Sequence, residues 1–202
     1  MVSVGERLVR IPVYKVVLCA VTPCFRNAFE GQFKEAEESS IRLPDIFEQT
    51  FRIFLHWAHF QVQLEGFVFD ENNSSNDARF IVNEPVDNYC TNEKWLAKYK
   101  TPMMVFLRIY VLADRYPIRQ LRDDILSSML GHAIGYEYYP DPDIDIISYA
   151  YDNLPATSPF ISYFVLSTAY YWLPYGDAEA KVHQPRSWNE DFCAKVMVAM
   201  TE

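Results

Sequence analysis

Among the residues that could do chemistry, His56 and His59 have the spacing closest to that of a metal-binding site. They stand three positions apart, so a helix would carry both imidazoles on one face. Two such imidazoles bind zinc when further ligands join them, as in an HExxH segment. No HExxH segment and no carboxylate partner accompanies this pair. We therefore expect an exposed or partner-facing role for the two histidines in preference to a metal site.

The four cysteines predict reduced thiols. Cys19, Cys24, Cys90 and Cys193 are scattered and form no CxxC pair. Disulfide scaffolds use cysteines far more densely in chains of this length. Because Cys19 and Cys24 lie five residues apart in an apolar helical stretch, we interpret both as small core residues in preference to metal ligands.

Other catalytic signatures are missing from the sequence. No nucleophile, base and orienting group can be recognised as a set, and no GxSxG, P-loop or GxGxxG string occurs. Clustered acidic residues in turn-like segments are typical of a solvated face: Glu35, Glu37, Glu38, Asp141, Asp143 and Asp145. We accordingly predict that the protein is not an enzyme, binds no cofactor and holds no metal.

Composition indicates a globular intracellular protein. The chain has 202 residues, of which 50% are hydrophobic and only 6 are glycine, so it can bury a substantial core. Its net charge of −9 argues against nucleic-acid binding, which needs clustered basic residues. No apolar run reaches the ~20 residues of a membrane span, and charges interrupt the N-terminal segment where a signal peptide is apolar. We expect a location in the cytoplasm, the nucleus or both.

Strand signals come first along the chain. Alternating residues at 2–4 and 8–13 predict a short hairpin that turns near Gly5. An apolar helical stretch follows. Thr22 and Pro23 then predict the start of a second helix, because threonine caps N-termini and proline suits the first helical position. Gly31 marks the end of this helix, and a third strand is expected at 40–43.

A long third helix is predicted to begin after Asp45. Aspartate is a favoured N-cap, and Glu48, three residues later, completes a capping box. The apolar residues of this helix recur on one face: Phe47, Phe51, Phe54, Leu55 and Ala58. The opposite face is polar and carries Glu48, Gln49, Arg52 and His56.

The periodicity fails between residues 61 and 100. A polar tract at 70–77 indicates either an inserted hairpin or a loose loop in this stretch. Helices are predicted again at 101–116, 118–134, 144–153, 158–172 and 187–200, the last from a capping box that starts at Ser187. A turn-rich acidic link after residue 135 separates two domains. They are residues 1–135, with the insert at 61–100, and an all-helical extension at 136–202.

Tyrosine is frequent in this extension, where it occurs at Tyr149, Tyr151, Tyr163, Tyr170 and Tyr171. We interpret these side chains first as core packing between helices. The alternative is an exposed groove, because tyrosine contributes a large contact area at protein interfaces.

Three residue strings resemble the BTB/POZ domain family. Pro12–Leu18 with Thr22–Phe29 resembles the family segments V-H-K-x-x-L and S-P-x-F-R-x-x-F. Gly31–Ala36 with Ile41–Asp45 resembles F-x-E followed by I-x-L. The third and most specific string, Leu107–Ile118 with Leu121–Arg122, resembles the helix pair Y-x-L-A-D-x-Y-x-I-x-x-L. The order of the predicted elements is also that of a BTB/POZ domain.

The resemblance implies an α+β fold, with a small three-stranded sheet capped by a helical cluster and followed by an all-helical C-terminal extension. The tail residues 149–153 resemble those of filamentous-fungal BTB proteins. Two departures are informative. Tyr14 replaces the usual histidine, so the hydrogen bond of that imidazole must be replaced or absent. The insert follows Phe60, where the family has a short fourth strand.

The resemblance further implies a non-catalytic protein–protein interaction module. In the family, the third helix, the loop after it and the start of the fifth helix bind a cullin. The corresponding residues here are Glu48, Arg52, His56, His59, Phe60, Ile118 and Arg119. We therefore predict an adaptor or substrate-receptor subunit of a cullin-type ubiquitin ligase. The alternative is an assembly or oligomerisation module of a regulatory or transcriptional complex without ligase activity, which a buried Phe60 would favour.

The expected partners are proteins, namely a cullin scaffold, a client protein or both, and neither nucleic acid nor membrane. The sequence starts at the first strand, without the leading helix that dimeric members of the family exchange between subunits. We therefore expect a monomer or a weak homodimer.

Overall fold

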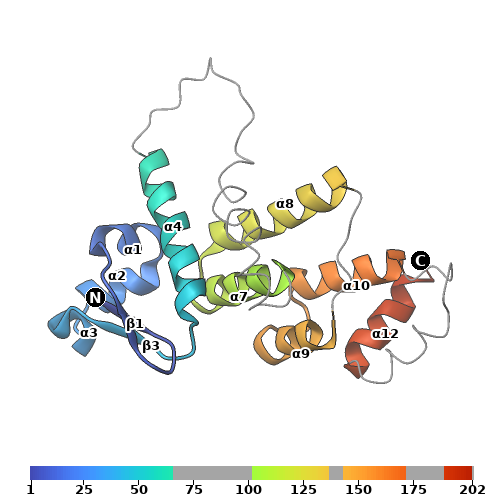
Figure 1. Cartoon of the computed structure of the whole chain (residues 1–202), viewed down its shortest axis with the longest axis horizontal. Helices are drawn as coiled ribbons and strands as arrows, with labels where there is room; N and C mark the ends of the chain where they lie inside the picture. Colours follow the sequence, from blue (N-terminus) through green and yellow to red (C-terminus); the bar gives the residue numbers. More distant parts are fainter. Residues whose placement is uncertain (66–101, 137–142, 172–188, 202) are drawn as a thin grey trace, which may run out of the picture. The chain divides into compact units, whose positions relative to one another are not determined.

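The computed structural model describes residues 1–65, 102–136, 143–171 and 189–201 (Figure 1). The chain divides into two compact units, Met1–Ser128 and Met129–Glu202, which are treated separately below. The division falls inside a helix, α8 (Arg119–Tyr136), seven residues before the boundary predicted at residue 135.

Unit 1 begins with a three-stranded sheet in the order β2-β1-β3 (Figure 1). β1 (Val2–Val4) and β2 (Val9–Ile11) form the antiparallel hairpin predicted from the sequence, and β3 (Ile41–Leu43) pairs with β1 in parallel. A parallel pair needs a long crossover connection, which the helices between β2 and β3 provide. Alternate strand residues are apolar and buried, and form one side of the core: Val2, Val4, Ile11, Ile41 and Leu43.

Three helices make up this crossover: α1 (Lys15–Val21), α2 (Pro23–Glu30) and α3 (Lys34–Glu38). Thr22 caps α2 as predicted, since its Oγ1 accepts a hydrogen bond from the Cys24 amide at 3.2 Å. The same hydroxyl donates to the Tyr116 carbonyl oxygen at 2.9 Å. Thr22 is fully buried. One hydroxyl therefore joins the corner between α1 and α2 to a distant part of unit 1.

The next helix, α4 (Glu48–Glu65), differs from its predicted form at both ends. It begins at Glu48, whereas Asp45 lies in a turn and its carboxylate is paired with the Arg115 guanidinium at 3.5 Å. The predicted cap at Asp45 is therefore wrong. α4 also continues to Glu65, past residue 61 where the periodicity fails. The remainder of the predicted insert lies outside the described residues.

The described part of unit 1 is completed by α7 (Pro102–Arg115) and the first half of α8. The Trp57 indole Nε1 of α4 donates to Asp124 Oδ2 of α8 at 2.9 Å. Arg122 of α8 pairs with Asp114 of α7 at 2.7 Å. These polar contacts surround an apolar core that contains Leu107, Val111, Ile118, Leu121 and Ile125.

The two cysteines of the α1–α2 segment differ in exposure. Cys19 is buried, as predicted, and burial raises the pKa of its thiol, with Glu30 adding to the effect. Cys24 is exposed, so the prediction of a core position is wrong there. Cys24 precedes Phe25 in α2, and consecutive helical residues are rotated by about 100°, so its side chain lies off the face that buries Phe25 and Phe29. Cys90 lies outside the described residues.

Unit 2 contains the end of α8 together with α9 (Ile144–Asn153), α10 (Pro159–Tyr171) and α12 (Glu190–Ala199). Asp143 caps α9 by accepting a hydrogen bond from the Ile146 amide at 2.9 Å. Asn189 caps α12, two residues after the predicted cap, Ser187, which lies outside the described residues. The core of the unit is apolar and includes Ile146, Ile147, Ala150, Phe160, Phe164, Phe192 and Val196.

The tyrosines of unit 2 are divided between core and surface. Tyr163 is buried, Tyr149 and Tyr151 are half-buried, and Tyr170 is 69% exposed. The side chain of Tyr171 lies outside the described residues. Core packing therefore accounts for Tyr163, whereas Tyr170 lies on the surface.

A polar cluster joins α9 to α12. The Tyr151 hydroxyl donates to Asp191 Oδ2 at 3.0 Å, and the Lys195 ammonium lies 2.7 Å from the same oxygen. Lys195 also donates to the Ala156 carbonyl oxygen at 2.7 Å. Hydrogen bonds from Lys195 and Tyr151 lower the pKa of Asp191. Burial, together with the bond to Asp191, raises the pKa of Tyr151.

Replacing Thr22 with Val is expected to lower the free energy of unfolding by about 2 kcal/mol, because the variant loses a helix cap and leaves a buried carbonyl oxygen without its donor. Thr22→Ser keeps the hydroxyl and removes one methyl group, so we expect a loss below about 1 kcal/mol. Urea unfolding followed by circular dichroism measures both variants. A loss from Thr22→Val no larger than the loss from Thr22→Ser would contradict the contribution assigned to the hydroxyl.

Replacing Asp191 with Asn is expected to lower the melting temperature at pH 7. Because the folded pKa of Asp191 is depressed, the stability gained from its ionised form is present above the unfolded pKa of about 3.9 and is lost as pH falls through the folded value. Thermal melts at pH 7 and near pH 3 should show the difference between wild type and variant shrinking in acid. Glu190→Gln is the control, since it removes a charge from the same helical turn. A loss independent of pH would contradict the assignment.

Candidate protein-interaction surface

α4 has one buried face and one accessible face. The buried face carries Phe51, Phe54, Trp57 and Ala58, each no more than 4% exposed. The accessible face carries five of the seven residues predicted to contact a partner: Glu48, Arg52, His56, His59 and Phe60. These five residues are called the α4 strip. Glu48, Arg52, His56 and Phe60 follow one another at four-residue spacing, and His59 lies three residues after His56. Residues with these spacings are neighbours on the surface of a helix.

The first turn of the α4 strip is held by an ion pair. Arg52 Nε donates to Glu48 Oε1 at 2.9 Å, and a terminal guanidinium nitrogen lies 2.8 Å from the same oxygen. Both side chains remain partly exposed, at 52% and 39%. Exposed pairs of this kind contribute only ~0.3–0.5 kcal/mol to stability, so a partner can replace the contact at little cost.

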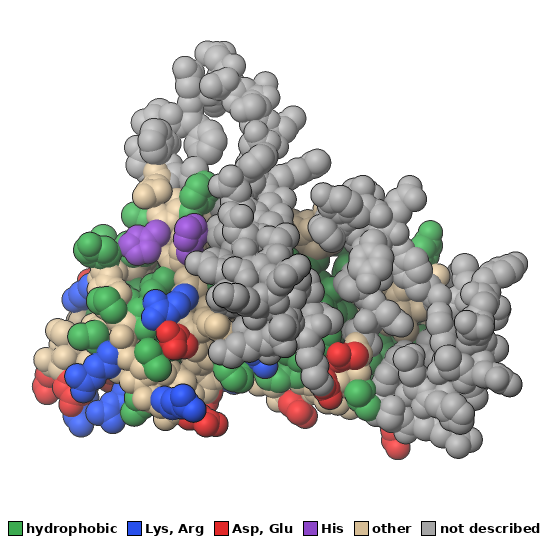
Figure 2. Space-filling model, viewed as in Figure 1, with side chains coloured by type: hydrophobic (Ala, Val, Ile, Leu, Met, Phe, Trp, Pro, Cys, Tyr) green, Lys and Arg blue, Asp and Glu red, His purple; other side chains and the backbone are tan. Residues whose placement is uncertain are grey.

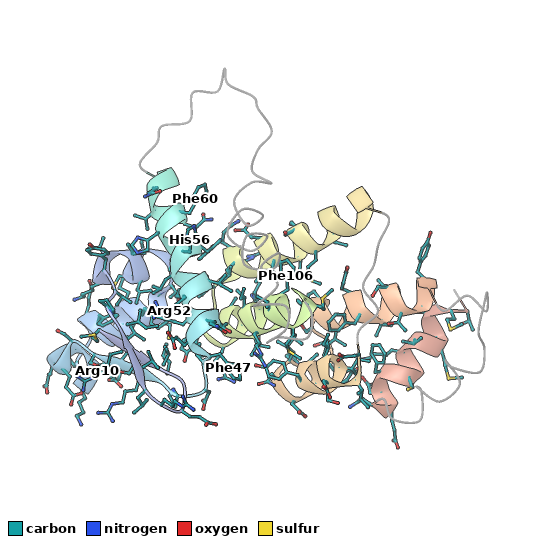
Figure 3. All side chains as sticks on the ribbon, in the orientation of Figure 1. Arg10, Phe47, Arg52, His56, Phe60 and Phe106 are labelled. Atoms are coloured by element: carbon teal, nitrogen blue, oxygen red, sulfur yellow. The ribbon has the colours of Figure 1, made fainter. Side chains whose placement is uncertain are left out.

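The middle of the strip carries the two histidines, which lie on one face of unit 1 (Figure 2). His56 is exposed, and His59 is half-buried. The imidazole of His59 meets the ring of Tyr14 edge to face, with centroids 5.8 Å apart. Figure 3 shows Arg52, His56 and Phe60 following one another along α4. Phe60 is half-buried, so its ring is partly accessible.

Two residues beside the α4 strip were not singled out as partner contacts from the sequence. Tyr14 is 72% exposed and Val16 is 74% exposed at the start of α1, a helix that packs against α4. The sequence assigns both to an apolar helical stretch, and only their fractional exposure separates them from the buried Val17 and Leu18. The family's histidine position is thus occupied by a tyrosine that contacts His59.

The two remaining predicted contacts lie on a different element. Arg119 is exposed in the first turn of α8, with its guanidinium 3.9 Å from Asp123. Ile118 is only 1% exposed and belongs to the core. Its side chain is therefore not accessible to a partner in this structure.

Within the described residues, no three His, Cys, Asp or Glu side chains converge as a metal site would require. His59 contacts Tyr14, and no third ligand joins the two histidines there. Among the helices that the structure describes, none combines the length and apolar character of a bilayer-spanning segment.

A small three-stranded sheet with a parallel β1–β3 pair, followed by the two-faced helix α4, defines an α+β domain. Residues 2–65 match the family model of the BTB/POZ domain. This part of the chain is a BTB/POZ domain, and domains of that family are protein–protein interaction modules. No curated protein and no solved structure matches the chain.

Substitutions on the two faces of α4 should separate stability from binding. We expect Arg52→Ala and His56→Ala to change the free energy of unfolding by no more than about 0.5 kcal/mol, because neither side chain packs in the core. Phe54→Ala should cost about 3–5 kcal/mol, since the ring is fully buried. Urea unfolding measures all three. A large loss from His56→Ala would show that the α4 strip supports the fold.

Proposed function

We propose that the chain is an adaptor or substrate-receptor subunit of a cullin-type ubiquitin ligase, and that the α4 strip with Arg119 contacts the cullin. The observation that carries the proposal is the two-faced character of α4. The aromatic face of α4 is buried in the core. The opposite face corresponds to the cullin-binding face of this helix in the family, and it is accessible from Glu48 to Phe60.

The composition of the α4 strip supports a protein partner. Interfaces are enriched in arginine and aromatic residues, and a few such residues dominate the binding energy. Arg52, the histidines and Phe60 offer these groups in one row, and the exposed Tyr14, which contacts His59, adds an aromatic ring beside it. Phe60, which keeps part of its ring accessible, is the aromatic anchor of this surface.

The mechanism of such a subunit is scaffolding. A chain that holds a client protein on one surface and the ligase on another converts their encounter into an intramolecular event and raises the effective concentration of the client. No bond is made or broken by the chain itself. What it supplies is a rigid α4 that presents the cullin contacts in a fixed order.

Binding to purified cullins tests the proposal. The whole chain should bind at least one cullin directly, and the triple variant Arg52→Ala/His56→Ala/Phe60→Ala should weaken that binding by about 30-fold or more, because truncation of central arginine and aromatic contacts costs ~2 kcal/mol or more. Arg7→Ala is the matched control, since it removes an exposed arginine from another part of the same domain.

Two outcomes would contradict the proposal. If the chain bound none of the cullins, the alternative of an assembly or oligomerisation module would replace it, and light scattering would then test for a stable homo-oligomer. If a cullin bound equally well to the wild type and to the triple variant, another surface would be responsible. Circular dichroism of the triple variant verifies that it is folded.

A further inference from the structure

The outer face of the three-stranded sheet carries one row of side chains: Arg10 of β2, Ser3 of β1 and Arg42 of β3. The strand register sets this row, because Ser3 lies opposite Arg10 in the antiparallel pair and opposite Arg42 in the parallel pair. Their neighbours along each strand point to the other face, into the core. Both arginines are exposed, and Ser3, 8% exposed, separates them. These three residues are called the arginine row.

The arginines of this row are not engaged within the described part of the chain. Residues 1–65 contain seven lysines and arginines. Four of them have partners, namely Lys15 with Glu30, Lys34 with Glu38, Arg52 with Glu48, and Arg26 with the Cys19 carbonyl oxygen. Arg7, Arg10 and Arg42 make neither an ion pair nor a hydrogen bond with the described residues. All three lie in the sheet or in its hairpin turn, so the unpaired positive charge is concentrated there.

The acidic residues of unit 1 do not neutralise the unpaired positive charge of the sheet and its hairpin turn. Residues 1–65 carry eight acidic residues against seven basic ones, so most of the net charge of −9 resides in the rest of the chain. Three acidic residues of this segment, Glu30, Glu38 and Glu48, are paired with other cations. In the sheet and its hairpin turn, Glu6 is the one acidic residue against three arginines. A guanidinium without a partner is well suited to a carboxylate, which it binds through two parallel hydrogen bonds.

The spacing of the two arginines fits an extended chain. Neighbouring strands lie about 4.8 Å apart, so the backbones of β2 and β3, on either side of β1, are separated by about 10 Å. In an extended peptide, side chains two residues apart emerge on the same side at a spacing of ~7 Å. The long arginine side chains can bridge the difference between the spacing of the strands, about 10 Å, and the spacing of the peptide side chains, about 7 Å. Figure 3 shows Arg10 on the sheet, apart from Arg52, His56 and Phe60 of α4.

We propose that the arginine row binds an acidic, extended segment of a protein partner, with Arg10 and Arg42 each pairing with one carboxylate. Charge complementarity carries this choice of occupant, because the row offers two unpaired guanidiniums and no large apolar side chain. The surface is distinct from the α4 strip, so the inference stands whether or not the chain binds a cullin.

Fluorescence anisotropy with a fluorescein-labelled peptide of eight alternating glutamate and serine residues tests the proposal without a cullin. We expect saturable binding at about 50 mM salt that weakens with added salt. Arg10→Gln/Arg42→Gln should weaken the binding at least about tenfold, because each arginine loses charge-assisted hydrogen bonds. Lys34→Gln, which removes an exposed but paired charge of the same domain, should change the binding by less than about twofold, since it lies outside the row.

Three results would overturn the proposal. The first is no saturable binding of the glutamate peptide by the whole chain at about 50 mM salt, where surface electrostatics are strongest. The second is an equal loss of binding in the double variant and in Lys34→Gln, which would indicate a diffuse charge effect. The third is binding of a phosphoserine–serine peptide with no binding of the glutamate peptide, which would assign the row to phosphate. Circular dichroism confirms that the variants are folded.

Discussion

The aromatic cluster around Phe54 is the interaction on which unit 1 depends. Phe54 lies 5.7 Å from Phe51 and 6.2 Å from Trp57 on its own helix, and 6.0 Å from Phe25 of α2, between ring centroids. Phe25 in turn stacks on Tyr116, just beyond α7, at 5.3 Å. Each buried ring removes about 150–250 Å² from water, which corresponds to roughly 4–6 kcal/mol as an upper estimate. The cluster therefore joins three helices that are far apart in the sequence.

This cluster also fixes the rotation of α4 about its axis. With Phe51, Phe54 and Trp57 turned inward, a helix of 3.6 residues per turn must turn Arg52 and His56 outward. Two polar contacts hold this rotation in place. Trp57 is hydrogen-bonded to Asp124, and Thr22 connects the α2 end of the cluster to the Tyr116 carbonyl oxygen. The accessible face of α4 is thus a consequence of the core, and does not depend on contacts made by the α4 strip itself.

Local patterns predicted much of this arrangement. Alternation gave the hairpin, the Thr22-Pro23 pair gave the start of α2, and the apolar periodicity of α4 separated Phe51 and Phe54 from Arg52 and His56. Tertiary competition explains the failures. The Asp45 carboxylate suits an N-cap, but in the folded chain it pairs with Arg115, seventy residues away in the sequence.

Exposure was harder to predict than secondary structure. Val16 and Val17 are adjacent and chemically identical, yet Val16 is 74% exposed and Val17 is buried, since only one side of α1 meets α4. Ile118 matched a family contact position in sequence but lies in the core. A residue string identifies an element and its approximate place, whereas the packing partners decide which of its side chains reach solvent.

The sheet shows how short strands divide their residues between fold and surface. Each strand has three residues, and the outer two lie on the core side, where Val9 is half-buried and the others are buried. The central residues lie on the opposite side, where Arg10 and Arg42 are exposed and Ser3 is buried. Arg10 and Arg42 can therefore remain charged and unpaired without weakening the core, because the flanking Ile11, Ile41 and Leu43 supply the buried apolar area. An adaptor needs two surfaces that can be occupied at once. In unit 1 the α4 strip is set by the aromatic cluster and the arginine row by the strand register, so a substitution in one surface can leave the geometry of the other unchanged.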